Sequence, residues 1–367
     1  MESRIRVLVV DDSAFMRKAI CRMLGKDRAI EVVGEGRDGA EAVELVAKLR
    51  PDVVTMDVEM PKMKGLEALR AIMAVSPTPV IMVSSLTNEG ARVTLDALDA
   101  GAIDFVAKNI EGGAAEIAKI QSTLVGKIKT AAMARVGGAW EDEPALALHA
   151  VAGSSTSTRI GPRPVEGPAA RSVGQRPSVV VIGSSTGGPK ALQEVLVTLP
   201  KDLPVAIVAV QHMPTNFLPH FAERLNGLCA VNVRLAEDGD RLAAGTVLIA
   251  PGDMHCRVVR DSGGAAVIHL DPQPAEALHR PSVDELMLSA AKACPGEVLG
   301  VILTGMGADG TKGMVAIKKS GGTTLGQDAA TSVVYGMPRS AYEAGAVDEQ
   351  VPIHRMAAMI VERSSSK

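Results

Sequence analysis

The stretch IRVLVVDD at residues 5–12 decides the fold of the first part of the chain, because a short apolar run ends directly at two acidic residues. Isoleucine and valine in such a run favour a buried β-strand. Similar apolar runs return at residues 30–33, 53–56, 80–83 and 103–106. The stretches between them, such as residues 14–24 and 39–49, repeat apolar residues at helical spacing. Strands alternating with helices predict an α/β domain over residues 1–135, with a five-stranded parallel, doubly wound sheet.

The overall composition leaves room for a second domain and excludes several functions. The 367 residues exceed one average domain, and 47% of them are hydrophobic, which is enough for two buried cores. The formal net charge of −3 offers no basic surface for nucleic acid. The four cysteines form no Cys-x-x-Cys pair, which fits neither a disulfide framework nor a zinc knuckle.

The N-terminal sequence predicts a protein that stays inside the cell. The apolar run at residues 7–10 meets Asp11 and Asp12 at once, so it does not make a signal peptide. No stretch approaches the roughly 20 apolar residues that a membrane span needs. We therefore expect a cytoplasmic protein without direct membrane insertion.

A change of composition marks the middle of the chain. Residues 136–177 are rich in proline and glycine, contain the tract SSTST, and have few large aliphatic side chains. Such a segment buries too little apolar surface to offset its chain entropy, so it predicts a flexible linker. Strand and helix patterns return afterwards and predict a second α/β domain over residues 178–367. We expect a mainly parallel sheet there, with an antiparallel excursion between residues 231 and 270.

Acidic residues gather at the strand ends of the first domain. Asp11 and Asp12 follow the first strand, and Asp57 follows the third. Ligands of parallel sheets bind beyond the carboxyl ends of the strands. Three carboxylates there repel one another unless a hard divalent cation lies between them, and this predicts a magnesium site. Each acidic residue is, by itself, equally consistent with a helix N-cap.

Two further polar residues flank the same predicted pocket. Ser84 ends the fourth strand, and Lys108 follows the fifth. A hydroxyl and an ammonium group at these points are each able to hold a phosphoryl oxygen. A full set of polar residues at the strand ends is harder to reach by chance than any single one.

The segment GSSTGGP at residues 183–189 predicts a nucleophile in the second domain. It follows an apolar strand and fits Gly-x-Ser-x-Gly, with Ser185 at the centre of a strand–turn–helix corner. The N-terminus of the following helix offers free N–H groups for a developing oxyanion. Taken alone, the segment is equally consistent with a glycine-rich anion-binding loop.

A serine nucleophile needs a base and an orienting carboxylate, and both stand at strand ends. Among seven histidines, His212 follows the apolar run 205–210 and precedes Met-Pro, a sharp break. Asp309 lies in the glycine-rich segment TGMGADG at residues 304–310, again after an apolar run. It could equally cap the helix that begins at Thr311. Three consistent strand ends favour a triad of Ser185, His212 and Asp309.

The first domain resembles the receiver domain of two-component response regulators over roughly residues 3–130. The resemblance is carried by VVDDS at 9–13, MDVEMP at 56–61 and VSS at 83–85. It implies that Asp57 is the phosphoacceptor and a magnesium ligand with Asp11 and Asp12, that Ser84 and Lys108 sense the phosphoryl group, and that Phe105 is the switch aromatic. Receivers typically have proline after the lysine, whereas this chain has Asn109.

The second domain resembles the chemotaxis protein-glutamate methylesterases. The matching segments are GSSTGG at 183–188, QHMP at 211–214, HRPSVD at 279–284 and TGMGADG at 304–310. Family members usually have alanine where this chain has Ser184, and the motif position still selects Ser185. We expect His212 to act as the base and the backbone N–H groups of Thr186 and Met306 to hold the oxyanion.

The two resemblances together imply a phosphorylation-regulated esterase. Its substrates would be methyl-accepting chemoreceptors, which are long helical bundles, with glutamine deamidation at the same site. A chemotaxis histidine kinase would be the phosphodonor, magnesium would bind the receiver, and the esterase domain would need no cofactor. Arg280 is a candidate substrate contact, and a structural salt bridge is the alternative. The rival functions are a response regulator whose second domain only binds a partner, and a lipase-like hydrolase.

Overall fold

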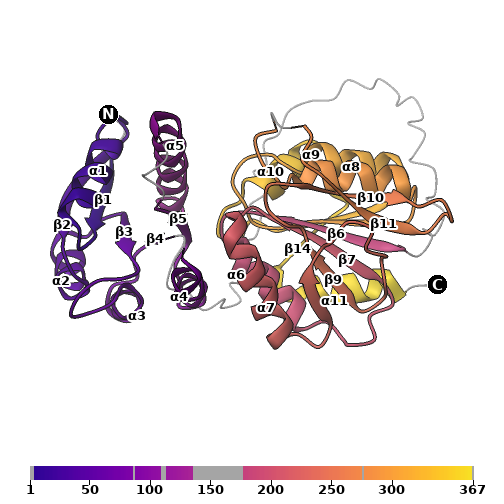
Figure 1. Ribbon diagram of the computed structural model, residues 1–367, viewed down its shortest axis with the longest axis horizontal. Coiled ribbons are helices and arrows are strands. Elements are labelled where there is room, and N and C mark those ends of the chain that lie inside the picture. Colours follow the sequence, from indigo (N-terminus) through magenta and orange to yellow (C-terminus); the bar gives the residue numbers. More distant parts are fainter. Residues whose placement is uncertain (1–3, 86, 109–112, 135–176, 275–276, 366–367) are drawn as a thin grey trace, which may run out of the picture.

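The computed structural model describes residues 4–85, 87–108, 113–134, 177–274 and 277–365. The predicted linker, residues 136–177, lies outside these residues except for Pro177. Two α/β units stand side by side, and the chain passes once from one to the other (Figure 1). Within the described residues, no helix combines the length and the apolar character that crossing a membrane requires.

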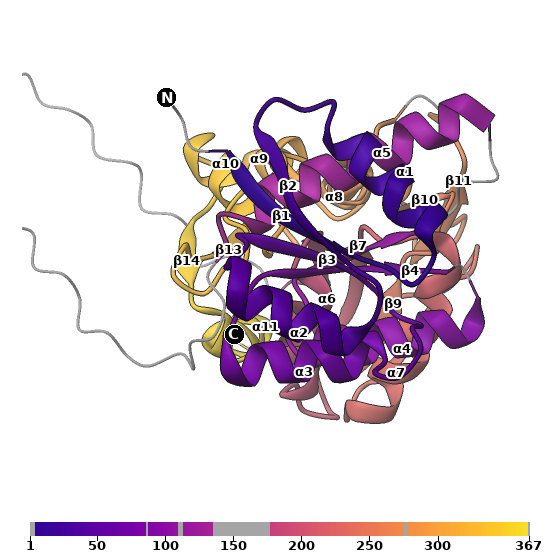
Figure 2. The same cartoon turned by 90° about the vertical axis from the view of Figure 1, so that its left-hand side faces the viewer.

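The first unit is a five-stranded sheet with helices on both faces, as its alternating sequence predicted. The strand order is β2-β1-β3-β4-β5, and all neighbours are parallel. Helices α1 and α5 cover one face, and α2, α3 and α4 cover the other (Figure 2). The elements are β1 (Ile5–Val10), α1 (Ala14–Leu24), β2 (Ile30–Gly36), α2 (Gly39–Leu49), β3 (Val53–Asp57), α3 (Gly65–Val75), β4 (Val80–Ser84), α4 (Asn88–Asp99), β5 (Asp104–Ala107) and α5 (Gly113–Ala131).

The second unit is built on a seven-stranded parallel sheet with the order β14-β13-β12-β6-β7-β9-β8. Its elements are β6 (Val179–Ser184), α6 (Gly188–Val197), β7 (Ala206–Gln211), η1 (Thr215–Phe217), α7 (Leu218–Leu228), β8 (Asn232–Leu235), β9 (Thr246–Ile249), β10 (His255–Arg260), β11 (Ala266–Asp271), α8 (Val283–Ala293), β12 (Val298–Ile302), α9 (Thr311–Lys319), β13 (Thr323–Gln327), α10 (Met337–Glu343), β14 (Glu349–Val351) and α11 (Ile353–Ser365). The expected antiparallel excursion is confined to the hairpin of β10 and β11, because β8 and β9 join the main sheet in parallel.

The direction in which strands are added to the sheet reverses at β6. From β6 the chain first builds outward through β7, and it later returns to place β12 on the other side of β6. The connections after β6 and β12 therefore leave the sheet in different directions. Parallel sheets bind ligands at such a switch point. Ser185, His212 and Asp309 follow the three strands that meet there.

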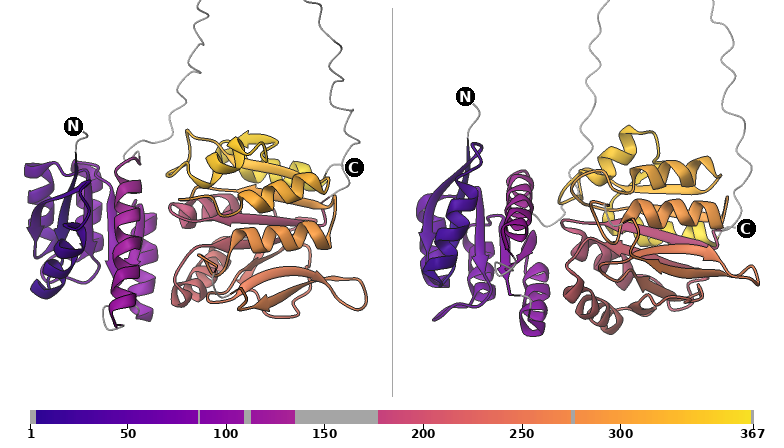
Figure 3. Two further views of the ribbon diagram at one scale, coloured as in Figure 1. Left: turned by 90° about the horizontal axis from the view of Figure 1, so that it is seen from above. Right: turned by 45° about the horizontal axis from the view of Figure 1, so that its top comes forward.

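The two units share one continuous hydrophobic cluster. It contains Leu95 and Leu98 of α4 together with Phe217 and Phe221 of the second unit, all buried. Figures 1 and 3 show α4 and α5 on the side of the first unit that faces the second. Burying apolar side chains between the units stabilises their contact. The first unit is therefore packed against the second near the carboxyl end of β6.

Candidate functional site

Three predicted residues lie at neighbouring strand ends of the seven-stranded sheet. Ser185 follows β6, His212 follows β7, and Asp309 lies in the turn between β12 and α9. Because β6 pairs with both β7 and β12, the three ends share one edge of the sheet. The His212 N–H donates to the Ser184 carbonyl at 3.0 Å, and the Ser185 N–H donates to the Thr304 carbonyl at 3.1 Å. The main chain thus fixes Ser185 between the two neighbouring turns.

The carboxylate of Asp309 accepts hydrogen bonds at both oxygens. Its Oδ2 accepts from His212 Nε2 at 2.9 Å and from the Val283 N–H at 2.8 Å. Its Oδ1 accepts from the Ser282 hydroxyl and the Asp284 N–H, both at 2.9 Å. Burial raises the pKa of this carboxyl, but the hydrogen bond from His212 and the N–H groups at the start of α8 hold the pKa well below its usual range. Asp309 is therefore ionised at neutral pH.

This hydrogen bond fixes the tautomer of His212. An ionised carboxylate only accepts hydrogen bonds, so Nε2 carries the hydrogen and Nδ1 carries the lone pair. Nδ1 is buried and has no hydrogen-bond partner within the described residues. No hydrogen bond joins the Ser185 hydroxyl to His212 in the part of the chain that the structure describes. The imidazole is thus oriented to accept a proton at Nδ1.

A second histidine lies directly against His212. The rings of His212 and His279 stack, with their centroids 4.1 Å apart and their planes inclined by 18°. Burial, helped by the nearby His212, lowers the pKa of His279 to about 4. His279 is therefore neutral near pH 7. Its segment, HRPSVD, carried the family resemblance, but no pattern in that segment indicates that this ring packs on the base.

The residues proposed as oxyanion donors also contact the first unit. Neither the Thr186 N–H nor the Met306 N–H has an acceptor among the described residues. The Thr186 hydroxyl donates to Asp104 Oδ2, in β5 of the receiver-like unit, at 2.6 Å. A Cβ added at Gly126 of α5 would lie 3.2 Å from Met306 Cε, so α5 packs closely on that side chain. The first unit thus contacts both turns beside Ser185.

Ser184 and Gln211 form a buried polar pair behind the candidate nucleophile. Ser184 is fully buried, and its hydroxyl donates to Gln211 Oε1 at 2.7 Å. The Gln211 amide nitrogen donates to the carbonyls of Ser185 at 2.9 Å and His212 at 3.0 Å. Sequence reasoning gave neither side chain a role, because their contacts depend on the register of two strands. Ser184 is hidden from any substrate.

The three acidic residues at the strand ends of the first unit lie close together. Carboxylate oxygens of Asp11, Asp12 and Asp57 lie within 4.8 Å of one another. Lys108 Nζ lies 2.7 Å from Asp11 Oδ2 and 2.8 Å from Asp57 Oδ1, so the lysine is well placed despite the following Asn109. Burial raises the pKa of Asp57 to about 6, against the opposing effect of Lys108. A set of carboxylate oxygens around one point fits a hard cation such as Mg²⁺.

The two predicted switch residues face different neighbours. The Ser84 hydroxyl accepts from Thr94 Oγ1 at 2.8 Å and donates to the Gly90 carbonyl at 3.3 Å, so it is bonded to α4. The Phe105 ring lies 4.4 Å from the ring of Phe217 in the second unit. These contacts link the strand ends of the acidic pocket to the surface between the units.

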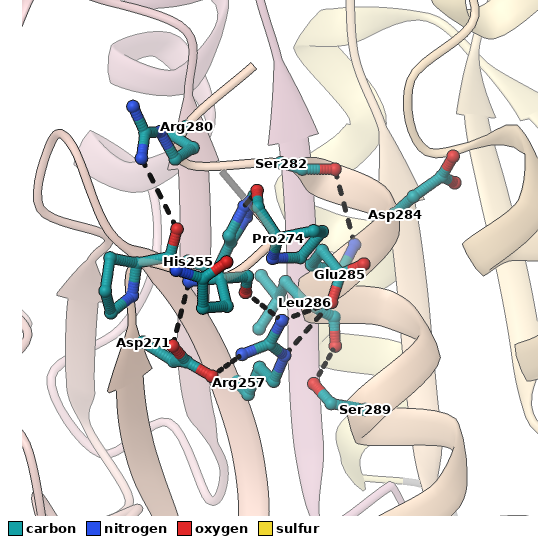
Figure 4. A network of polar contacts seen from close by, with 12 residues as sticks. His255, Arg257, Asp271, Pro274, Arg280, Ser282, Asp284, Glu285, Leu286 and Ser289 are labelled. Atoms are coloured by element: carbon teal, nitrogen blue, oxygen red, sulfur yellow. Dashed lines mark hydrogen bonds and ion pairs between the residues drawn. The ribbon is translucent and has the colours of Figure 1, made fainter. Parts of the chain in front are cut away.

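Arg280 lies apart from the strand-end cluster. It is exposed on the connection from β11 to α8, and its Nη1 donates to the Pro272 carbonyl at 3.4 Å (Figure 4). It forms no ion pair with any residue that the structure describes. Leu278, two positions earlier, is 90% exposed. An available cation and an available apolar side chain therefore flank His279.

The sequence matches two protein-family models, the response regulator receiver domain over residues 7–119 and the CheB methylesterase over residues 180–360. A protein-glutamate methylesterase/protein-glutamine glutaminase 1 from Oleidesulfovibrio alaskensis is 48% identical over 97% of this chain and 98% of that protein. This chain belongs to the protein-glutamate methylesterase/protein-glutamine glutaminase family.

A second relative agrees with this family. A protein-glutamate methylesterase/protein-glutamine glutaminase from Geobacillus kaustophilus is 47% identical over 98% of both chains. The solved catalytic domain of the Thermotoga maritima CheB methylesterase is 41% identical and covers 51% of this chain and 98% of its own, with a TM-score of 0.49. The resemblance inferred from the motifs and the predicted fold class of receiver and methylesterase are confirmed. The family domains also fit the two units seen in the structure.

Proposed function

We propose that this chain is a phosphorylation-regulated serine esterase that hydrolyses glutamate γ-methyl esters on methyl-accepting chemoreceptors, and that it also deamidates receptor glutamines. It would act in adaptation of a two-component chemosensory pathway. One observation carries the proposal: the hydrogen-bonded pair of His212 and Asp309 stands at the strand ends beside Ser185, with Nδ1 oriented to accept a proton. The names of the relatives support the choice of substrate.

In the acylation step, Ser185 Oγ bonds to the ester carbonyl carbon while its proton moves to His212 Nδ1. The N–H groups of Thr186 and Met306 are the donors for the resulting oxyanion. When the bond to the methoxy group breaks, His212 returns the proton and methanol leaves. A water molecule, deprotonated by His212, then attacks the acyl group and releases glutamate. With glutamine as substrate, ammonia leaves in place of methanol.

The acidic pocket is the proposed phosphorylation site. Asp57 would accept the phosphoryl group from a chemotaxis histidine kinase, and Asp11, Asp12 and Asp57 would hold Mg²⁺. A bound divalent cation offsets the negative charge that the carboxylates and the phosphoryl group bring together. Lys108 already lies 2.8 Å from Asp57, and with Ser84 it would hold phosphoryl oxygens. The proposed esterase chemistry uses only side chains and main-chain N–H groups, so it needs no cofactor.

The packing of the two units supports regulation by obstruction. Arg224 of α7 pairs with Asp96 of α4 at 2.7 Å and also with Asp99. On the same side of the receiver, β5 and α5 contact Thr186 and Met306. A receptor bundle needs space around Ser185, and the docked receiver takes that space. Phosphorylation of Asp57 would lower the population of the docked state and open the site. Arg280 would then be available to an acidic receptor surface.

Release of methanol from methylated receptor membranes tests this function, with phosphodonor and magnesium present. We expect Ser185→Ala to reduce the rate to background, because the proposed mechanism has no other nucleophile. Ser184→Ala should keep most of the activity, since that hydroxyl is fully buried and bonded to Gln211. The two serines are adjacent, so Ser184→Ala is a matched control. An inactive Ser184→Ala with an active Ser185→Ala would reverse the assignment, and no methanol at all would favour a partner-binding domain.

A further inference from the structure

The amide of Gln211 bridges the two strands that carry the candidate nucleophile and base. Gln211 ends β7, and its side chain is 1% exposed. Its two N–H donors are both used, one on the Ser185 carbonyl at 2.9 Å and one on the His212 carbonyl at 3.0 Å. A buried amide with all its donors satisfied is fixed in one orientation. The Gln211 side chain therefore holds the main chain at both Ser185 and His212.

We infer that Gln211 is a positioning residue that sets the direction of the Thr186 N–H toward the developing oxyanion. The inference rests on the proposed function, because it assigns a purpose to a donor of that esterase site. The Ser185 carbonyl and the Thr186 N–H belong to the same peptide unit. That unit is planar and trans, so its C=O and N–H point in opposite directions. A group that holds the Ser185 carbonyl therefore also determines the direction of the Thr186 N–H.

Two donors hold this carbonyl. Ser185 O accepts from the Gly188 N–H at 2.8 Å and from Gln211 Nε2 at 2.9 Å. Both accepting positions of the oxygen are then in use, and the peptide cannot rotate without breaking both bonds. The Thr186 N–H at the other end has no acceptor among the described residues, as an oxyanion donor should not before substrate arrives.

The surroundings fix which end of the amide faces the carbonyls. A carbonyl oxygen only accepts, so the NH₂ group must face Ser185 and His212. The other end, Oε1, accepts from the Ser184 hydroxyl at 2.7 Å. A Cβ at Gly188 would lie 2.2 Å from Oε1, so only glycine leaves room for the amide. The two carbonyls thus fix the orientation of the Gln211 amide, and Gly188 leaves it the room it needs.

The test compares Gln211→Met with the wild-type full chain, phosphodonor and magnesium present, in methanol release from methylated receptor membranes. Methionine keeps the volume of the side chain and removes both donors. We expect kcat to fall roughly 10- to 100-fold with KM nearly unchanged, because losing an oxyanion donor outright costs about 10²- to 10³-fold in kcat. Ser184→Ala, which removes the bond to Oε1 but leaves both N–H donors of Gln211 in place, should change kcat by no more than a few-fold.

Thr324→Val separates this effect from a general loss of stability. Thr324 is fully buried at the start of β13, and its hydroxyl bonds Asp348 at 3.0 Å, at the opposite end of the sheet. The Thr324→Val variant should have a lower melting temperature and an unchanged kcat.

If Gln211→Met does not fold, Gln211→Asn serves the same test, because its side chain is one methylene shorter and its N–H donors no longer reach the two carbonyls. A folded variant with wild-type kcat, or a loss confined to KM, would overturn the inference. An inactive wild type would instead refute the proposed esterase.

Discussion

At the scale of single residues, the stacked histidines show how one ring keeps its neighbour in place. His279 covers one face of the His212 ring, with centroids 4.1 Å apart. A second positive charge at that distance would oppose protonation of His212, which the proposed mechanism requires. Burial removes this conflict, since it lowers the pKa of His279 to about 4 and keeps the ring neutral. His279 thus provides packing for the base without competing for its proton.

A consequence of this pKa is measurable in the stability of the fold. An unfolded histidine has a pKa of about 6.5, so between about pH 4 and pH 6.5 the unfolded chain binds the extra proton. The contribution of His279 to stability is therefore present above pH 6.5 and is lost as the pH falls toward 4. In urea denaturation, His279→Phe should flatten the pH dependence there, by up to about 1.4 kcal/mol per pH unit. His269→Gln, at an exposed hairpin position, is the control. Equal slopes in His279→Phe and wild type would contradict the buried, neutral histidine.

At the scale of elements, the N-terminus of α8 positions the acid of the candidate triad. Ser282 caps this helix. The Asp309 carboxylate accepts hydrogen bonds from the first N–H groups of the helix, where an anion is stabilised. Arg257 of β10 holds the same end of α8 from the other side. It bonds Asp271 of β11 at 2.9 Å and Glu285 of α8 at 2.7 Å (Figure 4). The hairpin, the loop that carries His279 and the helix are thus tied together.

Arg257→Met tests whether the ion pairs of Arg257 with the hairpin and α8 affect the candidate active site. It leaves the carboxylates of Asp271 and Glu285 without their partner, so we expect the melting temperature to fall by a few degrees. Because α8 and the loop then loosen beneath Asp309 and His279, kcat should also fall several-fold. Arg234→Met removes a comparable pair with Asp240, at 2.6 Å on the edge strand β8, and should leave kcat unchanged. If both variants lose stability and neither loses kcat, the hairpin is only a structural attachment.

The sequence allowed the strand ends to be predicted because it repeats a simple pattern. An apolar run followed by a polar residue marks the end of a strand, and parallel strands bring such ends to one edge. Asp57, Ser185, His212 and Asp309 were located in this way. Gln211 and His279 gave no such signal, since their roles arise from strand register and from a loop crossing the site. Lys108 reached its pocket although the residue after it departs from the receiver pattern.

At the scale of the whole molecule, the structure shows a chain of contacts from the acidic pocket to helix α7 of the second unit. Ser84, at the pocket, is hydrogen-bonded to Thr94 of α4 at 2.8 Å. The far end of α4 carries the carboxylates that pair with Arg224. A phosphoryl group on Asp57 that drew Ser84 away would release α4 at one end. From the sequence we predicted only that the receiver obstructs the esterase site. The individual contacts between the two units could not be predicted, because they produce no periodic pattern in the sequence of either unit.

The contacts that hold the docked receiver are open to direct test in the full chain without phosphodonor. Asp104→Ala removes the bond to Thr186, and Arg224→Ala removes the pairs with α4. Each change weakens the docked state, so the resting rate of methanol release should rise several-fold, provided the docked state is dominant. Phosphodonor should then stimulate these variants less than wild type, and Asp57→Asn should not respond to it.

Arg92→Ala is the control at the same surface, because Arg92 and Glu223 lie 3.5 Å apart with both side chains about 70% exposed, and exposed pairs contribute little. The resting rate of this variant should stay near that of the wild type.

Residues 177–367 expressed alone should set the upper limit of the resting rate, since they lack the receiver entirely. Because obstruction acts by keeping substrate out, the fragment must exceed the resting full chain. If it is active but no faster, the receiver does not inhibit by docking, and it instead activates the esterase or directs it to its target.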